Sequence, residues 1–501
     1  MRVIEDKCVG CGLCAQDCPL GLIEIVDKKA RINEGCVNCM TCFKVCPKEA
    51  LEKEEEIKPG VVKCNNCPIM CEIPPDKVGA CQRFVNKNGK LIRNIPLHLF
   101  EDVKDVVGED FAPSIKEPLI TGIGAGTTYP DFKPAPYIVE AKVDGVDVVT
   151  VVTEAPLSYS GIKVKIDTEK NIGEEGADVY FEKRKVGHIT TEEYGSKMLS
   201  LGGANLLTGK DGMKVARVIC DIANRKEVKL KIAKGSELII KVGDPPIIDG
   251  EIMGKMRVGC GSASMGLFGP FFKEAADEVI VIDSHITGLF SEHPAGTALL
   301  VPYSGVILKA RKSTLGRYFG DHGEGWGGTS ITDPIAIVKG VDKTIARPGM
   351  TLLITETTGE RAAFYKLGKD YKFHQEEMPP NAAKAVEVIA STCEKSRVSA
   401  IYVGGAGGSA RAGVVRYPLK LSKAVHEKKA KLTVGGAPTF VLPGGGITFM
   451  VNVEQVKVNA FSWVPTPATV APIEYTMKKE DYIEMGGHAE AIKPFSLIKK
   501  R

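Results

Sequence analysis

The cysteines are the residues whose type and spacing most clearly indicate chemistry, because twelve of the fifteen lie between Cys8 and Cys81. The run Cys-x2-Cys-x2-Cys-x3-Cys-Pro occurs twice, beginning at Cys8 and again at Cys36. In two-cluster ferredoxins the first three cysteines of each run bind one 4Fe–4S cluster, and the fourth binds the other. The sequence therefore predicts one cluster on Cys8, Cys11, Cys14 and Cys46, and a second on Cys36, Cys39, Cys42 and Cys18. Structural zinc is disfavoured here, because zinc sites use pairs of Cys-x2-Cys.

A third group of four cysteines follows directly, at Cys64, Cys67, Cys71 and Cys81. Four thiolates within eighteen residues form a closed site, and their spacing fits either a third 4Fe–4S cluster or structural zinc. The position favours iron, because a cluster immediately after a ferredoxin domain would relay electrons into the rest of the chain. We expect iron and keep zinc as the alternative.

The glycine-rich segment Gly316–Pro334 is the second region that predicts chemistry, since its glycines surround Asp321, His322 and Glu324. Many glycines cost conformational entropy, and they are tolerated where backbone approaches a ligand or closes as a lid. Histidine donates protons readily near neutral pH, so we expect His322 to act as a proton donor oriented by Asp321 or Glu324. The alternative is an exposed loop without chemistry.

Two glycine-rich turns resemble the dinucleotide-binding pattern without matching it fully. Gly259 and Gly261 precede Asp283, which follows the next predicted strand and could accept hydrogen bonds from a ribose. Gly405 and Gly407 form the other turn, and the third position of the pattern is not glycine in either. A bound flavin is one interpretation, and close packing of a helix on a strand is the other. Arg411 follows the second turn and could hold a substrate carboxylate.

The pattern of strands and helices around these residues predicts the fold that positions them. We expect an α+β ferredoxin-like N-terminal domain followed by an α/β body. Apolar strands entering glycine-rich turns recur near residues 119–126, 256–263 and 401–408, which suggests three related α/β units. Chance similarity among glycine-rich turns is the alternative. The expected division is 1–57 for the ferredoxin domain, 58–100 for the third cysteine group, and 101–250, 251–375 and 376–501 for the three units.

Composition and charge limit the partners and the location that we expect for this protein. The net charge of +4 and the absence of a long basic stretch argue against nucleic acid as a partner. The longest apolar runs have the length of strands, and the N-terminus lacks the apolar core of a signal peptide. We therefore expect a cytoplasmic protein of a reducing, anaerobic setting, with no membrane partner, that assembles as a homo-oligomer.

The two-cluster ferredoxin pattern, the third cysteine group and the segment GDHGEGWGGT in a glycine-rich body together resemble the 6-hydroxynicotinate reductase family. The resemblance covers the whole chain. It implies that reduced ferredoxin, or another low-potential donor, drives reduction of a small hydroxylated pyridine carboxylate to a tetrahydro-6-oxonicotinate. Two alternatives stay open: an electron-transfer subunit of a larger complex, and a non-redox enzyme acting on a ring, with structural clusters.

Overall fold

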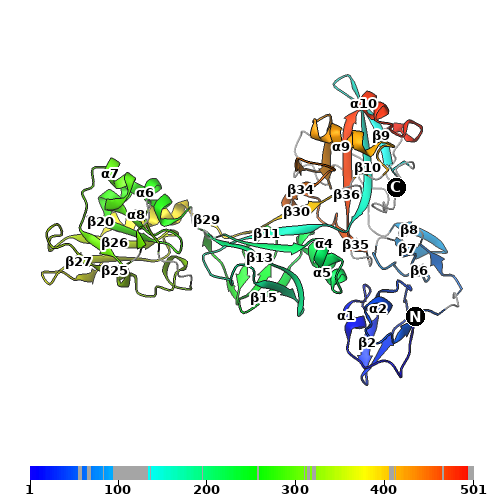
Figure 1. Ribbon diagram of the computed structural model, residues 1–501, viewed down its shortest axis with the longest axis horizontal. Helices are drawn as coiled ribbons and strands as arrows, with labels where there is room; N and C mark the ends of the chain where they lie inside the picture. Colours follow the sequence, from blue (N-terminus) through cyan, green and yellow to red (C-terminus); the bar gives the residue numbers. More distant parts are fainter. Residues whose placement is uncertain are drawn as a thin grey trace.

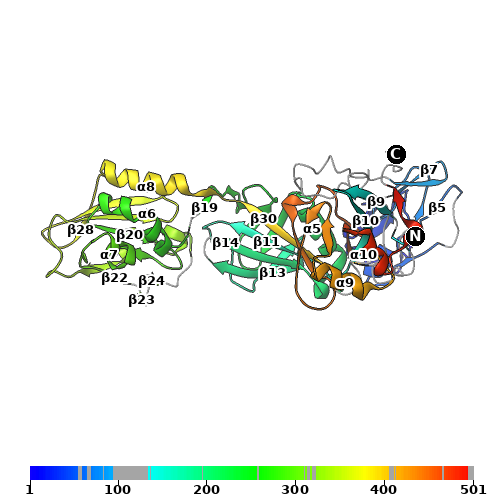
Figure 2. The ribbon, with the colours of Figure 1, turned by 90° about the horizontal axis from the view of Figure 1, so that it is seen from above.

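The computed structural model shows an elongated molecule in which a ferredoxin-type domain and two extended sheets lead to a separate distal domain (Figures 1 and 2). It describes residues 1–54, 59–64, 69–82, 84–93, 134–135, 137–193, 196–256, 259–309, 311–312, 316–318, 323–405, 411, 413–464 and 468–494.

The N-terminal domain is built from short elements around its cysteines. They are β1 (Arg2–Val3), α1 (Leu13–Gln16), β2 (Ile23–Val26), β3 (Lys29–Ile32), α2 (Thr41–Val45) and β4 (Leu51–Glu52). Antiparallel pairs form between β1 and β4 and between β2 and β3. Two further hairpins follow, made of β5 (Val62–Lys63), β6 (Glu72–Ile73), β7 (Phe84–Lys87) and β8 (Lys90–Arg93). These elements bring cysteines of both runs together around one small hydrophobic cluster.

An eleven-stranded antiparallel sheet forms the centre of the molecule. Its strands, in spatial order, are β18 (Glu251–Ile252), β17 (Ile247–Ile248), β16 (Glu237–Ile240), β15 (Val228–Ile232), β12 (Asp178–Phe181), β13 (Arg184–Glu193), β14 (Ser196–Gly202), β11 (Gly161–Asp167), β30 (Val398–Gly404), β34 (Phe449–Asn452) and β33 (Phe440–Val441). The helices α4 (Ala204–Leu207) and α5 (Gly212–Ala223) lie against it.

A seven-stranded sheet lies beside the central one. It contains β32 (Ala437–Pro438), β31 (Ala430–Val434), β36 (Ala468–Lys478), β10 (Val146–Leu157), β9 (Tyr137–Val143), β37 (Lys493–Pro494) and β35 (Ser462–Val464). Its helices are α9 (Pro418–His426) and α10 (Lys479–Glu484). We call this unit the C-terminal sheet.

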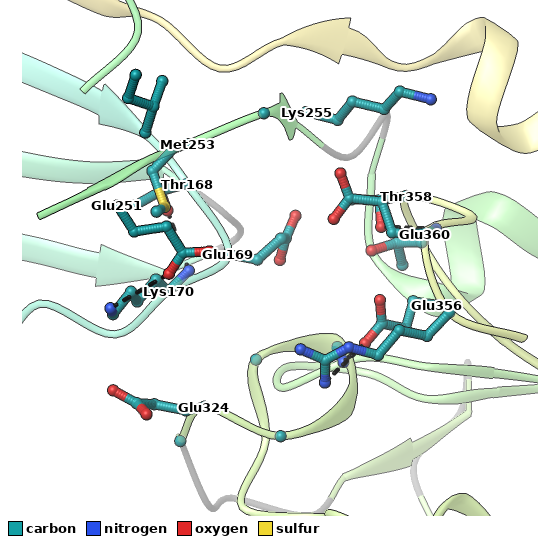
Figure 3. Close-up of a pocket in the computed structure, with 18 residues that line it drawn as sticks. Thr168, Glu169, Lys170, Glu251, Met253, Lys255, Glu324, Glu356, Thr358 and Glu360 are labelled. Carbon is teal, nitrogen blue, oxygen red and sulfur yellow. Dashed lines mark hydrogen bonds and ion pairs between the residues drawn. The ribbon is translucent and has the colours of Figure 1, made fainter. Parts of the chain in front are cut away.

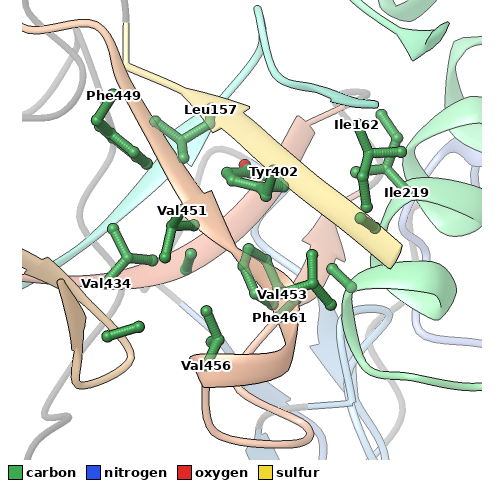
Figure 4. Packing of buried hydrophobic residues seen from close by; sticks show 14 of the residues in the cluster. Leu157, Ile162, Ile219, Tyr402, Val434, Phe449, Val451, Val453, Val456 and Phe461 are labelled. Carbon is green, nitrogen blue, oxygen red and sulfur yellow. The ribbon is translucent and has the colours of Figure 1, made fainter. Parts of the chain in front are cut away.

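The two large sheets share one hydrophobic core (Figure 4). Tyr402 of β30 lies at its centre, with its ring centroid 4.6 Å from that of Phe461. Its hydroxyl group is hydrogen-bonded to Thr469 Oγ1 of β36 at 2.6 Å, and Ile219 of α5 packs into the same core. Because burial of apolar surface is the main stabilising term, this shared core makes the two sheets one body.

The distal domain has a five-stranded sheet in the order β21 (Gly288–Leu289), β20 (Glu278–Ile282), β26 (Thr351–Glu356), β27 (Ala362–Leu367) and β28 (Phe373–Glu376). Helices α6 (Gly261–Ala275) and α8 (Pro380–Thr392) cover one face, and α7 (Pro294–Ala298) lies nearby. The apolar run of β20 is buried on both faces, as expected for a strand in a parallel pair. Small strand pairs complete it: β22 (Val306–Leu308) with β25 (Val338–Val341), β23 (Arg311–Lys312) with β24 (Arg317–Tyr318), and β19 (Lys255–Met256) with β29 (Glu394–Lys395).

The body is a mixed α and β structure made mostly of strands, and the three related glycine-rich units are not confirmed. Strand β10 pairs with β36 and β11 pairs with β30, so strands of the first expected unit share sheets with strands of the third. Among the described strands, parallel pairing is limited to β20 with β26 and β9 with β37. A glycine-rich turn after an apolar strand is compatible with either direction of pairing, so the pattern alone does not determine the sheet partners. The turn at 119–126 lies outside the described residues.

Among the helices that the structure describes, none is both long and apolar enough to cross a membrane.

Candidate functional site

The first predicted set of cysteines surrounds one small cavity in the ferredoxin-type domain. Its walls include Cys8, Cys11, Cys14 and Cys46 together with apolar side chains. The backbone N–H of Ala30 donates to Cys8 Sγ and that of Ala50 donates to Cys46 Sγ, each at 3.3 Å. Such N–H to sulfur hydrogen bonds are among the factors that set the potential of an iron–sulfur cluster.

The second predicted set surrounds a neighbouring cavity, which is lined by Cys18, Cys36, Cys39 and Cys42. The N–H of Leu22 donates to Cys18 Sγ at 3.3 Å, and Cys39 Sγ donates to Thr41 Oγ1 at the same distance. Cys18 and Cys46 thus each join the set of the other run, as the spacing predicts.

The buried thiols of both cavities resist ionisation on their own. Burial raises the pKa of Cys14 to about 11 and that of Cys42 to about 12, and neighbouring thiols add to both shifts. A thiolate is the form that binds a metal, so these residues need a nearby positive charge to ionise at neutral pH. Four sulfur donors, apolar walls and N–H groups directed at sulfur fit an iron–sulfur cluster, which would supply that charge.

The third cysteine group lies between the ferredoxin-type domain and the C-terminal sheet. Cys64 and Cys71 are buried in a small core with Val37, and the Cys64 N–H donates to the Cys71 carbonyl oxygen at 2.8 Å. Cys81 packs against Ala468 and Val470 of β36. The fourth member, Cys67, lies outside the described residues. The described cysteines of this group therefore connect the ferredoxin-type domain to β36.

A separate pocket of about 530 Å³ lies between the central sheet and the distal domain (Figure 3). We call it the carboxylate pocket. It is bounded by residues 168–170 after β11, 251–255, the glycine-rich segment 323–328, and the turn 356–361 after β26. Its carboxylates are Glu169, Glu251, Glu324, Glu356 and Glu360, and its cations are Lys170, Lys255 and Arg361. The pocket lies where the parallel strands β20 and β26 end, a common place for ligands in α/β sheets.

Glu356 ties the glycine-rich segment to the end of β26. The N–H of Gly327 donates to Glu356 Oε1 at 2.8 Å. Burial raises the pKa of Glu356, and this hydrogen bond and the charge of Arg361 oppose only part of that rise. Gly327 has φ 59°, and a Cβ atom there would lie 2.3 Å from the Ile282 carbonyl oxygen, so this position requires glycine.

The charge of the carboxylate pocket is unfavourable for an anion. Five carboxylates face three cations, and all three cations are already engaged, since Arg361 lies 3.6 Å from Glu356 Oε1. Lys170 lies 3.6 Å from Asp249 and 3.7 Å from Glu251, and Lys255 Nζ donates to the Ala390 carbonyl oxygen. Like charges in a partly enclosed site repel, so a carboxylate ligand would bind here at a cost.

Of the predicted catalytic residues in the glycine-rich segment, the structure describes only Glu324, which is exposed and lines the carboxylate pocket. Asp321 and His322 lie outside the described residues. Their predicted roles stay predictions.

The turn predicted to bind a cofactor at the start of α6 is engaged in packing. A Cβ atom on Gly261 would lie 2.5 Å from the carbonyl oxygens of Val281 and Ile286, so glycine lets α6 lie directly on β20. Gly259 precedes α6 by two residues. Asp283 is fully buried, and its Oδ2 accepts a hydrogen bond from Ile286 N at 2.9 Å. A cofactor-binding role for these residues stays a prediction.

Arg411 lies at the C-terminal sheet rather than at the carboxylate pocket. Its guanidinium donates to Ser422 Oγ and to the Pro418 carbonyl oxygen of α9, and its buried Nε has no hydrogen-bond partner among the described residues. Burial raises the pKa of Tyr475 on β36, and the charge of Arg411 opposes that rise. Gly405 follows β30, whereas Gly407 lies outside the described residues. Arg411 is thus held against α9 and is not among the residues that line the carboxylate pocket with Glu324.

Sequence reasoning missed Glu474, a fully buried carboxyl group in β36. Its Oε2 accepts hydrogen bonds from Thr433 Oγ1 at 2.7 Å and Gly436 N at 3.4 Å, whereas Oε1 has no partner among the described residues. Burial raises the pKa of Glu474 to about 8. Because side chains alternate along a strand, Glu474 shares a face with Val470, which contacts Cys81. A glutamate inside the apolar run of β36 was the available signal.

The arrangement of the cysteines defines a class of protein. Residues 7–51 match the family described as a 4Fe-4S dicluster domain, and this region holds both four-cysteine cavities. The chain is therefore an iron–sulfur protein with a two-cluster ferredoxin domain joined to a much larger body.

Sequence similarity to a named protein identifies the particular family. The chain is 49% identical over 502 residues to 6-hydroxynicotinate reductase of Eubacterium barkeri, which covers 99% of this chain and 100% of the relative. The chain belongs to the 6-hydroxynicotinate reductase family and is an oxidoreductase. No solved structure matches it.

Proposed function

We propose that this protein reduces 6-hydroxynicotinate to a tetrahydro-6-oxonicotinate, with electrons from reduced ferredoxin or another low-potential donor. The observation that carries the proposal is the near-complete alignment with a 6-hydroxynicotinate reductase. The match of residues 7–51 to a 4Fe-4S dicluster domain and the two cysteine cavities support it. The pyridone form of such a substrate has a ring carbonyl conjugated to a C=C bond. Two electrons and two protons add across that bond.

Electrons enter through the two-cluster domain and leave toward the C-terminal sheet. The third cysteine group lies on this route, because its core includes Val37 of the ferredoxin-type domain and its Cys81 contacts β36. A redox group in this position extends the relay, whereas zinc would end it. We therefore assign a third 4Fe–4S cluster to Cys64, Cys67, Cys71 and Cys81. Pairing of single electrons by a flavin stays a prediction.

The substrate binds beside the C-terminal sheet, with its carboxylate held by Arg411. Two arguments favour this place over the carboxylate pocket. The pocket has more carboxylates than cations and repels an anion, whereas Arg411 has a buried Nε without a partner among the described residues. The distal domain, which supplies much of the lining of the pocket, also lies across the central sheet from the ferredoxin-type domain, and electron transfer slows steeply with distance (Figure 1). Glu474 provides a neutral acid on the strand that Cys81 contacts, which makes it a proton source alternative to His322.

The test is an anaerobic assay of the purified protein with reduced ferredoxin and 6-hydroxynicotinate, with the product identified by mass spectrometry. Iron and zinc are measured on the same sample. Twelve irons per chain and oxidation of the reduced clusters by substrate are the expected results. Eight irons with one zinc would contradict the relay. Clusters that accept electrons but are never reoxidised by a pyridine carboxylate would contradict the activity and favour an electron-transfer subunit.

Two variants locate the substrate. Arg411→Lys is expected to raise KM with a smaller effect on kcat, because lysine keeps the charge but loses the planar fork that holds a carboxylate. Glu324→Gln is the matched comparison at the carboxylate pocket and is expected to leave KM unchanged. The opposite result, a KM that responds to Glu324 and not to Arg411, would move the substrate to the pocket.

A further inference from the structure

A buried arginine joins the ferredoxin-type domain to the central sheet. Arg184 Nη1 lies 2.9 Å from Asp17 Oδ2 and 3.0 Å from Asp211 Oδ1, and its Nη2 donates to Gln16 Oε1 at 2.9 Å. The side chains of Arg184 and Asp17 are only 8% and 2% exposed. Ion pairs this deeply buried depend on every partner, because a remaining charge would be left without solvent or counter-ion.

Lys214 supports the same contact from the neighbouring helix α5. Its Nζ lies 2.6 Å from Glu182 Oε2 and 3.4 Å from the Gln16 carbonyl oxygen, and it sits 5.6 Å from the ring centroid of Phe181. The Lys214 side chain is 4% exposed. We call Arg184 and Lys214 the two-cation socket, which receives Gln16 and Asp17 at the end of α1.

Local structure positions the socket residues. Glu182 and Lys183 have φ 46° and 64°, the positive values of a type I′ turn, so β12 and β13 form a tight hairpin with Arg184 at its tip. Asp211 is the N-cap residue of α5, yet its side chain makes no cap hydrogen bond, since it lies against Arg184. A capping interaction worth about 1 kcal/mol is thus given up for the domain contact.

The socket lies directly beside a cysteine of the second cavity. Asp17 precedes Cys18, and Asp17 Oδ1 has no hydrogen-bond partner among the described residues, so Arg184 is the main compensation of this buried carboxylate. A second contact joins the cysteine-bearing region to the body, where Cys81 meets β36. We infer that the two-cation socket holds the ferredoxin-type domain at a fixed position against the body. The distance from its clusters to the body then stays short, and electron transfer between them stays fast.

Two consequences follow from removing Arg184. Loss of the contact lets the domain move away from the body, and electron transfer slows because its rate falls with distance. Loss of the positive charge also leaves Asp17 and Asp211 uncompensated near the second cluster, and nearby negative charge opposes the addition of an electron. The potential of that cluster is therefore expected to become more negative.

The experiment compares Arg184→Gln with the wild type, both fully loaded with iron. Clusters are reduced, mixed anaerobically with 6-hydroxynicotinate and followed by their visible absorbance. Reoxidation is expected to slow by about tenfold or more, which is about 1.4 kcal/mol in the barrier. A redox titration followed by electron paramagnetic resonance is expected to give a more negative midpoint for one cluster. Small-angle X-ray scattering is expected to show a larger radius of gyration.

Matched variants separate positioning from general damage. Arg317→Gln breaks a largely buried ion pair, with Glu292, in the distal domain and is expected to leave the cluster potentials and the radius of gyration unchanged. The double variant Asp17→Asn/Arg184→Gln removes one uncompensated charge and is expected to restore much of the potential, but not the reoxidation rate. Arg184→Lys provides a milder change should the glutamine variant fold poorly.

The inference about rate rests on the proposed function, whereas the potential and the scattering do not. A wild type that substrate never reoxidises would refute the proposed function alone. A fully loaded Arg184→Gln protein with wild-type rate and radius of gyration would overturn the positioning role, even if the cluster potential shifted.

Discussion

Glu474→Gln offers a quantitative test of the C-terminal sheet, because it replaces a buried acid by a neutral side chain of the same shape. Glu474 is fully buried in β36, and its pKa is raised from 4.5 to about 8 by that burial. At neutral pH the folded protein therefore keeps Glu474 protonated, whereas the unfolded chain releases the proton. Stability contributed by this group is fully present below pH 4.5 and is lost as the pH rises toward about 8.

The size of the effect follows from the shift. Each pKa unit corresponds to about 1.4 kcal/mol, so the whole window amounts to roughly 4–5 kcal/mol as an upper bound. The glutamine side chain does not ionise, so the Glu474→Gln variant lacks this pH-dependent contribution to stability. It is expected to be close to the wild type in stability at about pH 5, and to become progressively more stable than the wild type up to about pH 8.

The assay is thermal unfolding of both proteins under anaerobic conditions across this pH range, with the difference in Tm as the readout. Thr433→Val supplies an internal check, because it removes the hydroxyl donor to Glu474 Oε2 and should move the midpoint of the pH effect upward. Glu480→Gln is the surface control, since Glu480 is 79% exposed. A difference between Glu474→Gln and the wild type that does not vary with pH would refute the buried neutral acid.

Three further predictions follow from packing and from the cysteine cavities. Cys14→Ser is expected to remove the first cluster, seen as a loss of about four irons per chain with the second cluster still visible by electron paramagnetic resonance. Gly261→Ala places a Cβ atom 2.5 Å from two carbonyl oxygens and should destabilise the distal domain by about 1–3 kcal/mol, measured by denaturant unfolding. Tyr402→Phe removes a hydrogen bond to Thr469 of 2.6 Å and should cost about 1 kcal/mol by the same measurement, because Thr469 keeps its bond to Ser160.

The cluster region was predictable because its chemistry is encoded in short spacings. Cys8, Cys11 and Cys14 lie within seven residues, and the exchange of the fourth ligand, Cys18 for Cys46, follows from the repeat of the run itself. The structure places these residues around the same two cavities. A short stretch of sequence was enough to predict each cavity, because three of its four cysteines belong to one short loop.

The body was less predictable because its sheets are joined by contacts between distant residues. Strand β11 lies between β14, its near neighbour in sequence, and β30, which begins at Val398. An apolar strand followed by a glycine-rich turn carries no information about which partner it pairs with, or in which direction. The three-unit hypothesis is not confirmed, although the apolar runs from which it was built do form strands at Val146–Leu157, Glu278–Ile282 and Ala430–Val434.

The residues that connect electron entry to the body show the same limit in a functional setting. Arg184 and Asp17 are 167 residues apart, and neither belongs to a motif. An arginine at a hairpin tip is ordinarily a solvated surface residue, and only its 8% exposure distinguishes it. Glu474 is different, because a single acid within an apolar strand conflicts with its neighbours in the sequence. Such local conflicts often mark functional residues, so Glu474 is recognisable from the sequence without a motif. The contact between Arg184 and Asp17, in contrast, can be recognised only in the folded structure, because nothing in the sequence near either residue indicates it.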